Sequence, residues 1–222
     1  MLNLPNPTAA DLRNHPRVFV HDHPLLHHKL AKLRVPETDT PAFRARLGEV
    51  AGLMVWAATR DLPTRVIDIQ TPLEPTTARV LAEPVTVVPV LRAGLGMSEG
   101  VMHVMPEARI GHLGMARDEE TLEPHAYLER LPRDIGAGPV LLVDPMLATG
   151  GSAIAAARVL RRAGASSLRF VGLVGAPEGV SALLEADPEI DVHLAAIDRQ
   201  LDERGYILPG LGDAGDRAFG TL

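Results

Sequence analysis

The 222-residue sequence contains no cysteine, so disulfide bonds, thiol catalysis and cysteine-based zinc sites are excluded. Aromatic residues make up only 3% of the chain, and its core must therefore be mainly aliphatic. No apolar run is long enough to cross a bilayer, and the first 15 residues lack the basic and apolar regions of a secretory signal. These absences predict a cytoplasmic protein that has no membrane partner.

Positive charge is also in short supply. The chain has 22 Lys and Arg against 28 Asp and Glu, which gives a net charge of −6. This balance argues against generic nucleic-acid binding, although a local basic pocket can still hold a phosphate. The length and the 46% hydrophobic content fit one globular domain. We therefore expect a single domain over residues 1–222 that binds no nucleic acid.

Helix-like and strand-like patterns alternate along the chain. Apolar spacing predicts helices over residues 25–33, 42–59, 94–105, 153–162 and 177–185. Buried strands are predicted over residues 85–90, 108–115, 140–143, 168–174 and 192–197. This alternation predicts an α/β fold with a mostly parallel central sheet covered by helices on both faces.

Three segments fall outside that alternation. Residues 1–22 are rich in proline and asparagine and show little periodicity, which predicts an extended N-terminal arm. Residues 64–81 alternate enough to form a hairpin or two strands. Residues 117–132 are charged and predict a projecting hairpin that is mobile without ligand, with its tip at residues 121–127.

The most informative segment is a strand, a loop and a helix in succession. Four apolar residues at 140–143 lead into Asp144, and the loop ends in Thr-Gly-Gly-Ser at 149–152. Glycines allow backbone N–H groups to approach an anion, and a helix N-terminus adds a favourable dipole. Asp144 alone could equally cap the following turn, but its place at the carboxyl end of a strand favours a ligand site. The segment therefore predicts a phosphate site.

Two common phosphate motifs do not fit this loop. A P-loop requires a lysine after its last glycine, and no lysine occurs here. The dinucleotide motif Gly-x-Gly-x-x-Gly is absent from residues 149–152, and the glycines at 94, 96 and 100 place the third one residue late. The order strand, Asp144, loop, Thr-Gly-Gly-Ser and helix instead resembles the 5-phosphoribosyl-1-diphosphate (PRPP) loop of type I phosphoribosyltransferases. Within them, Asp-Pro-Met-Leu-Ala-Thr-Gly-Gly-Ser at 144–152 is similar to the uracil phosphoribosyltransferase branch.

Other segments resemble the same branch from about His23 to the C-terminus. Arg-Ala-Gly-Leu-Gly at 92–96 resembles its turn after a strand, and residues 117–124 resemble its mobile arm. Residues 199–222, with Gly-Tyr-Ile-Leu-Pro-Gly-Leu-Gly-Asp-Ala-Gly-Asp-Arg inside them, resemble its glycine-rich, base-binding tail. Two positions depart from the pattern: Ala116, where the family usually has an aromatic residue, and Asp202, where it usually has Asn.

The resemblance implies a type I phosphoribosyltransferase-like fold and a pyrimidine salvage reaction, in which uracil and PRPP give UMP and diphosphate. It implies Mg²⁺ bound as Mg-PRPP, with no metal held directly by the protein. It also implies a homo-oligomer, dimer or higher, and raises GTP as an allosteric effector, because some members are activated by GTP.

The resemblance further implies roles for individual residues. Arg92 and Arg117 would hold the diphosphate, Asp144 would meet the ribose hydroxyls, and Asp213 would face PRPP and its metal. The implied PRPP contacts are Arg92, Arg117, Asp144, Pro145, Met146, Leu147, Ala148, Thr149, Gly150, Gly151, Ser152 and Asp213. The implied uracil contacts are Tyr206, Ile207, Gly212, Asp213 and Ala214. No side-chain general base is evident.

Each of these residues has a simpler interpretation. Arg92 could end a strand at the surface, and Arg117 could form surface ion pairs with the three acids that follow it. Asp213 could be an ordinary turn residue, and Tyr206 could belong to the core. Five histidines at residues 15–28 could bind a metal, but their irregular segment favours a solvated or interface role.

Two alternative functions remain open at this point. A transferase of the same fold could act on another base, such as hypoxanthine or orotate, although the uracil-type tail argues against this. An RNA-binding regulator could have kept the fold, but the net charge of −6 does not favour it.

Overall fold

The structure is a computed structural model that describes residues 8–117 and 124–221. Its centre is a sheet in the order β1-β11-β10-β8-β4-β6-β7, with β5 beside β4 and β9 beside β10. The strands of this sheet are β1 (Val18–Val20), β4 (Thr86–Leu91), β5 (Arg109–Ile110), β6 (His112–Arg117), β7 (Pro124–Arg130), β8 (Val140–Val143), β9 (Met146–Leu147), β10 (Leu168–Gly175) and β11 (Asp191–Ile197). All of its pairings are parallel except that of β6 with β7. The predicted, mostly parallel sheet is confirmed.

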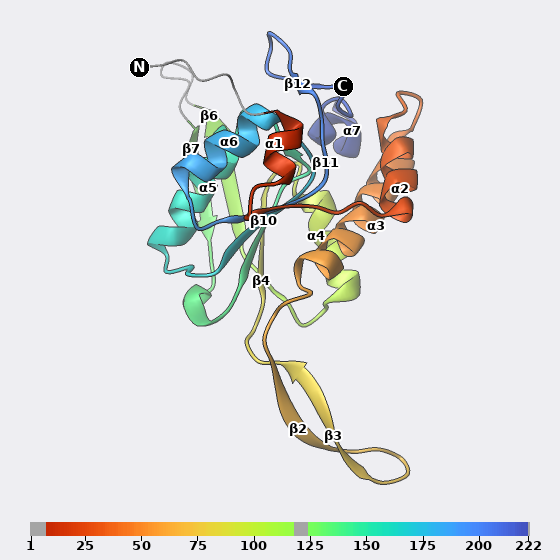
Figure 1. Cartoon of the computed structure of the whole chain (residues 1–222), viewed down its shortest axis with the longest axis vertical. Helices are drawn as coiled ribbons and strands as arrows, with labels where there is room; N and C mark the ends of the chain where they lie inside the picture. Colours follow the sequence, from red (N-terminus) through yellow and green to blue (C-terminus); the bar gives the residue numbers. More distant parts are fainter. Residues whose placement is uncertain (1–7, 118–123, 222) are drawn as a thin grey trace.

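Helices cover both faces of this sheet (Figure 1). They are α1 (Ala9–Arg13), α2 (Pro24–Arg34), α3 (Thr40–Ala58), α4 (Leu95–Val104), α5 (Gly151–Arg162), α6 (Pro177–Ala186) and α7 (Ala214–Phe219), with a 3₁₀ turn at Ile135–Ala137. Residues of α2, α3, α4 and α7 share one hydrophobic cluster, and residues of α1, α5 and α6 share another. Both clusters are mainly aliphatic, with Phe43 in the first and Phe170 in the second, as the scarcity of aromatic residues leads one to expect.

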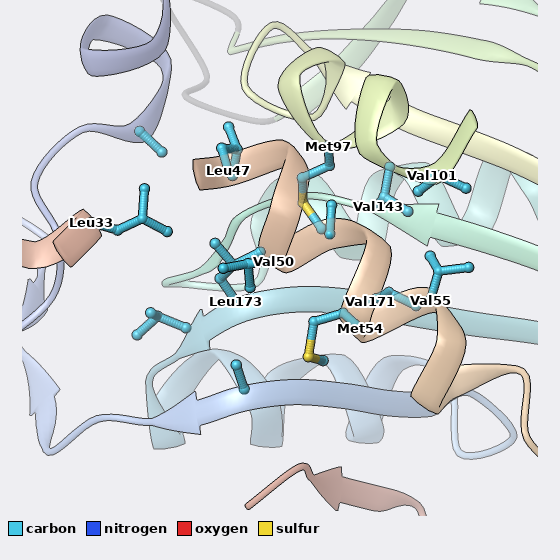
Figure 2. Close-up of a cluster of buried hydrophobic side chains, with 14 of the residues drawn as sticks. Leu33, Leu47, Val50, Met54, Val55, Met97, Val101, Val143, Val171 and Leu173 are labelled. Carbon is cyan, nitrogen blue, oxygen red and sulfur yellow. The ribbon is translucent and has the colours of Figure 1, made fainter. Parts of the chain in front are cut away.

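Side-chain alternation divides each strand between the two clusters. In β8, Leu141 and Val143 belong to the α3 side, whereas Val140 and Leu142 belong to the α5 side. Figure 2 shows the α3 side, where side chains of α3 and α4 meet those of the sheet. A strand that is apolar on both faces explains the continuous run that the sequence shows before Asp144.

The strand order reverses beside β4. From β4 the chain goes to β6 on one side, and β8, β10 and β11 follow on the other side. In open α/β sheets such a switch leaves a crevice at the carboxyl ends of the strands, where ligands bind. Pro89 of β4 lies opposite Val143 of β8, so Arg92 and Asp144 leave neighbouring strand ends.

A separate hairpin joins α3 to β4. Its strands, β2 (Thr64–Gln70) and β3 (Pro75–Leu81), pair antiparallel and extend away from the body, at the end opposite α7 and β12 (Figure 1). The hairpin predicted for residues 64–81 is confirmed. Its place at the amino-terminal end of β4 separates it from the crevice described above.

The prediction of an extended N-terminal arm is wrong for much of the described part. Residues 9–13 form α1, begun by a capping box in which Thr8 and Asp11 exchange hydrogen bonds. Residues 18–20 form β1, which pairs with β11 at the edge of the sheet. Elements of five and three residues are too short to show a period in the sequence, and β1 exists only through its partner strand.

The C-terminal tail is also more regular than predicted. It contains a two-stranded ladder of β12 (Gln200–Leu201) with β13 (Ile207–Leu208), followed by helix α7. Asp213 begins α7 by accepting a hydrogen bond from the backbone N–H of Asp216 at 2.9 Å. The sequence pattern did not predict this helix, because the glycines of the tail interrupt any helical spacing of apolar residues.

The arm predicted at residues 117–132 is described only in part. β6 and β7 form an antiparallel pair that ends at Arg117 and Pro124. Residues 124–127, predicted for the tip, therefore lie in or begin β7. Residues 118–123 lie outside the described part of the chain. None of the described helices is both long and apolar enough to span a membrane.

Candidate functional site

Three segments meet at the carboxyl edge of the sheet: the turn after β4, the loop after β8 and the C-terminal tail. The turn lies against the end of β8, because a Cβ on Gly94 would stand 2.5 Å from the carbonyl oxygen of Val143. It also reaches the tail, because a Cβ on Gly215 would stand 3.9 Å from the Cβ of Ala93. Residues far apart in the sequence are thereby brought to one crevice.

The loop at residues 148–152 has the form of an anion cradle. Gly150 adopts a left-handed conformation, with φ of 84°, directly before α5. The N-cap residue Gly150 has no side chain to cap α5, and the backbone N–H of Gly151 has only a long contact, 3.5 Å, to the Oγ1 of Thr149. The first backbone N–H groups of α5 therefore point towards any anion at this helix end, and the helix dipole adds to the attraction.

Helix α6 supports this loop from behind. A Cβ on Gly179 would stand 2.1 Å from the carbonyl oxygen of Ala148, so only a glycine allows this approach. The backbone N–H of Ala176 also donates to the carbonyl oxygen of Leu147 at 2.9 Å. The sequence did not indicate this support, since Pro177 and Glu178 read simply as the start of a helix.

Asp144 lies at the end of β8, as predicted, and it is half-buried. Burial, together with a smaller contribution from the nearby negative charge of Asp213, raises the pKa of its carboxyl to about 7. A hydrogen bond from the backbone N–H of Met146, at 3.3 Å, acts in the opposite direction. Asp144 thus both caps a turn and offers a carboxyl near its titration point, so the two interpretations of this residue are compatible.

This pKa predicts a stability cost above neutral pH. Between pH 4 and pH 7 the native state binds one proton more than the unfolded state at Asp144, so stability falls as pH rises. We expect Asp144→Asn, whose side-chain oxygen can still accept from Met146, to unfold at higher urea concentration than the wild type at pH 8. The gain should shrink by about 1.4 kcal/mol per pH unit on going from pH 7 towards pH 5. A difference in unfolding free energy that does not change with pH would contradict the assignment.

The loop and the tail line one pocket of about 410 Å³. Its lining residues are Met146, Ala148, Arg204, Gly205, Tyr206, Ile207 and Asp213. Five of these seven are among the residues predicted from the sequence. A Cβ on Gly205 would stand 3.5 Å from the Cγ2 of Thr149, which shows how closely the two segments approach. Tyr206 is 49% exposed here, so its interpretation as a core residue is wrong.

Arg204 and Gly205 were not among the predicted residues. They directly precede Tyr206, and their place at the pocket follows from the turn between β12 and β13, which the sequence did not reveal. Glu178 was missed as well. Its Oε1 accepts from the backbone N–H of Leu201 at 3.0 Å and ties the tail to the helix that supports the loop.

The tail is anchored by paired charges behind the pocket. Arg34 donates two hydrogen bonds to the buried Asp198, each 2.7 Å long, and a third to the carbonyl oxygen of Gly210. Asp198 in turn accepts from the backbone N–H of Gly210 at 2.8 Å. Ala214, the first residue of α7, is fully buried, and Gly212 is exposed with φ of 77°. The predicted uracil contacts therefore lie on a fixed backbone.

Of the two arginines predicted to hold the diphosphate, the structure describes the side chain of Arg92 only. The guanidinium of Arg92 lies 3.5 Å from the carboxylate of Asp216 in α7, so this arginine faces the tail and not only solvent. Arg117 ends β6, and its side chain lies outside the described part. The structure therefore brings Arg92, Asp144 and Asp213 to one edge and leaves the placement of the Arg117 side chain a prediction.

The histidines near the N-terminus have local partners. The ring of His23 accepts from the backbone N–H of Leu25 and caps α2, and the Nε2 of His21 lies 3.1 Å from the Nδ1 of His193. In the described ranges, no group of three side chains suits a metal ion. Larger hollows of about 880 and 690 Å³ lie between α3 and α4 and beside β1, but no residue of the loop or tail lines them.

Comparisons with known proteins agree with this geometry. The profile of the uracil phosphoribosyltransferase family matches residues 20–221. Uracil phosphoribosyltransferase of Levilactobacillus brevis is 53% identical over 201 residues, which cover 90% of this chain and 96% of the relative. The same-named protein of Streptococcus pneumoniae serotype 4 is 52% identical over 206 residues, covering 92% and 99%. The solved structure of the AQ2163 protein from Aquifex aeolicus has a TM-score of 0.87 at 36% identity, covering 91% of this chain and 97% of that one. The chain therefore belongs to the uracil phosphoribosyltransferase family.

Proposed function

We propose that this chain transfers the phosphoribosyl group of PRPP to uracil, giving UMP and diphosphate. The observation that carries the proposal is the pocket of about 410 Å³, which is lined jointly by the phosphate loop and by the uracil-type tail. A phosphate cradle alone would fit many enzymes. A tail of this type that lines the same pocket narrows the second substrate to a flat base with a polar edge.

In this reaction the bond between C1 of the ribose and the diphosphate oxygen breaks, and diphosphate leaves with the bonding electron pair. A bond between C1 and N1 of uracil forms, and N1 releases its proton to water. Charge separates at C1, so positioning and electrostatic stabilisation are the main tasks of the protein. We assign the diphosphate to Arg92 and Arg117 and the ribose hydroxyls to Asp144. The 5-phosphate is assigned to the backbone of Ala148, Thr149, Gly150, Gly151 and Ser152.

The base is assigned to the tail. Backbone groups of Ile207, Gly212 and Ala214 would pair with the polar edge of uracil, and the exposed ring of Tyr206 would cover its face. The N-cap bond from Asp216 fixes the carboxylate of Asp213, and Asp213 is one of the residues that line the pocket. This arrangement supports a role for Asp213 towards PRPP and its metal.

The donor set fits Mg²⁺ that arrives as Mg-PRPP. Asp213 lies close enough to Asp144 for its charge to raise the pKa of Asp144, and carboxylate oxygens are ligands that Mg²⁺ accepts. When bound, the ion would neutralise charge on the departing diphosphate. Asp144 would accept hydrogen bonds from the ribose hydroxyls of the complex, and Asp213 would face its metal.

We expect the purified protein to convert radiolabelled uracil to UMP when PRPP and Mg²⁺ are both present. EDTA should abolish the conversion, and excess Mg²⁺ should restore it. Hypoxanthine and orotate, tested in parallel, should give no nucleotide. If no UMP forms above the blank with Mg²⁺ present, or if another base is preferred, the proposed function is wrong.

We also propose that the chain forms a homo-oligomer. The β2–β3 hairpin stands clear of the body and exposes Val66 and Leu73, the latter at 94%. A two-stranded hairpin has little stability of its own, so a second copy that covers it would stabilise it. Light scattering coupled to size exclusion tests this, and a mass of 23.8 kDa in solution would contradict it.

GTP activation and a cytoplasmic location remain predictions from the family resemblance and the composition. Activation is tested by the rate of UMP formation with and without GTP at fixed free Mg²⁺. The location is tested by cell fractionation.

A further inference from the structure

The phosphate cradle lacks a cationic side chain of its own. Residues 144–152 contain no Lys, Arg or His. The N-terminus of α5 contributes the equivalent of about half a positive charge. A phosphate monoester carries about −1.5 to −2 charge near neutral pH. The backbone of the loop therefore leaves most of the charge of a 5-phosphate without a compensating partner.

Arg204 is placed to supply that partner. It lines the pocket together with Met146 and Ala148 of the phosphate loop, and it is the only cationic residue among the seven lining residues. Its neighbour Gly205 approaches the side chain of Thr149. Arg204 is exposed, and the ion pairs of the described residues do not include it. Its guanidinium is thus not committed to a carboxylate in that part of the chain.

The turn that carries Arg204 is held in place by its own hydrogen bonds. The Oδ1 of Asp202 accepts from the backbone N–H of Arg204 at 2.9 Å and from that of Tyr206 at 2.8 Å. Gly205 supplies the left-handed residue of the turn, with φ of 83°, and its N–H donates to the carbonyl oxygen of Asp202. This geometry keeps the backbone of Arg204 at the mouth of the pocket.

The same turn is fixed relative to the cradle. Leu201, which precedes the turn, donates to Glu178 in the first turn of α6. The next residue of α6, Gly179, packs against the carbonyl oxygen of Ala148 in the cradle. One helix therefore sets the distance between the turn and the phosphate loop.

We propose that Arg204 is a binding residue for the 5-phosphate of PRPP and of UMP. The guanidinium would donate charge-assisted hydrogen bonds to phosphate oxygens on the side of the cradle that the backbone of α5 leaves open. This inference rests on the proposed function for the identity of the ligand. It separates the arginines of the site into two groups, with Arg204 at the 5-phosphate and Arg92 at the diphosphate.

The test compares ligands that differ by one phosphate. Calorimetric titration of the full chain with UMP and with uridine measures what the phosphate adds, and titration with diphosphate probes the other end of the site. We expect Arg204→Ala to weaken UMP about tenfold and to leave uridine and diphosphate unchanged. Arg204→Lys should keep part of the UMP affinity. Arg162→Ala, which removes the same charge at the far end of α5, should change none of the three.

Equal weakening of UMP and uridine by Arg204→Ala would overturn the proposal, because it would show that Arg204 only supports the tail. No change in UMP affinity would overturn it too, because the side chain would then be merely solvated. Ribose 5-phosphate, titrated in parallel, separates this outcome from a failure of the proposed function. If Arg204→Ala weakens ribose 5-phosphate while the wild type makes no UMP from uracil, the role of Arg204 stands and the base assignment falls.

Discussion

Gly150→Val should lower the affinity for PRPP by at least about 100-fold while the protein still folds. Gly150 has φ of 84°, a conformation that a β-branched residue resists. Its Cβ would already stand 3.0 Å from the carbonyl oxygen of Gly179, so α6 leaves no room for the loop to relax on that side. The valine would therefore turn the backbone N–H groups at the start of α5 away from the phosphate.

The chain offers a matched control at the other end of α5. Gly164 also has a positive φ, of 103°, but a Cβ there would meet no atom within 4 Å. Gly164→Val should carry a similar backbone strain, roughly 1–3 kcal/mol, and bind PRPP as the wild type does. Circular dichroism checks folding, and the dependence of the turnover rate on PRPP concentration gives the affinity. A folded Gly150→Val protein with unchanged PRPP affinity would show that these glycines serve only the fold.

Local sequence rules were sufficient for this part of the site. The strand before Asp144, the glycines and the helix after them lie within about twenty residues, and the local residue types determine each of these elements. Apolar residues form the buried strand, and Gly150 permits a turn that other residues resist. Membership of one crevice could also be anticipated, because Arg92 and Asp144 both follow strands and parallel strands end at one edge.

Features that depend on distant partners could not be predicted in this way. Strand β1 forms because it pairs with β11 at the edge of the sheet, and three residues are too few to show the alternation of a strand. Helix α7 contains Gly215, which disfavours a helix, but the cap by Asp213 and packing on α3 stabilise it. The position of Arg204 depends on a turn in which Asp202 and Glu178 accept backbone hydrogen bonds, and no local sequence pattern indicates that role for either residue.

The structure explains how Asp202 can replace the asparagine that the family usually has at this position. A single oxygen of Asp202 accepts both backbone hydrogen bonds of the turn, and the side-chain oxygen of an asparagine could accept the same two. The turn is therefore preserved with either residue, and the difference is one negative charge beside Arg204. The side chain of Ala116, the other departure, lies outside the described part.

Uracil should be preferred over cytosine by about 10⁴-fold or more in kcat/KM. Uracil presents an acceptor, a donor and an acceptor along O2, N3 and O4, whereas cytosine presents an acceptor, an acceptor and a donor. Backbone N–H and C=O groups cannot exchange roles as a hydroxyl or an amide side chain can. A tail that reads the base through its backbone is therefore committed to one pattern.

The anchors of the tail prevent it from adapting to cytosine. Ile207 is held in the β12–β13 ladder, and a Cβ on Gly210 would stand 2.1 Å from its carbonyl oxygen, so the chain turns back sharply there. Arg34 and Asp198 fix the same turn from behind. Cytosine would then leave two polar groups opposed in a desolvated pocket, each at a cost of about 1–3 kcal/mol.

5-Fluorouracil provides the control for this prediction. The 5-position lies off the recognised edge and fluorine is small, so this base should be converted at a rate similar to uracil, whereas cytosine should not. Steady-state kinetics with the three bases at saturating Mg-PRPP give the ratios directly. Comparable kcat/KM values for cytosine and uracil would refute recognition by the backbone of the tail even if uracil is converted efficiently, because only a pocket with exchangeable donors and acceptors could accept both edges.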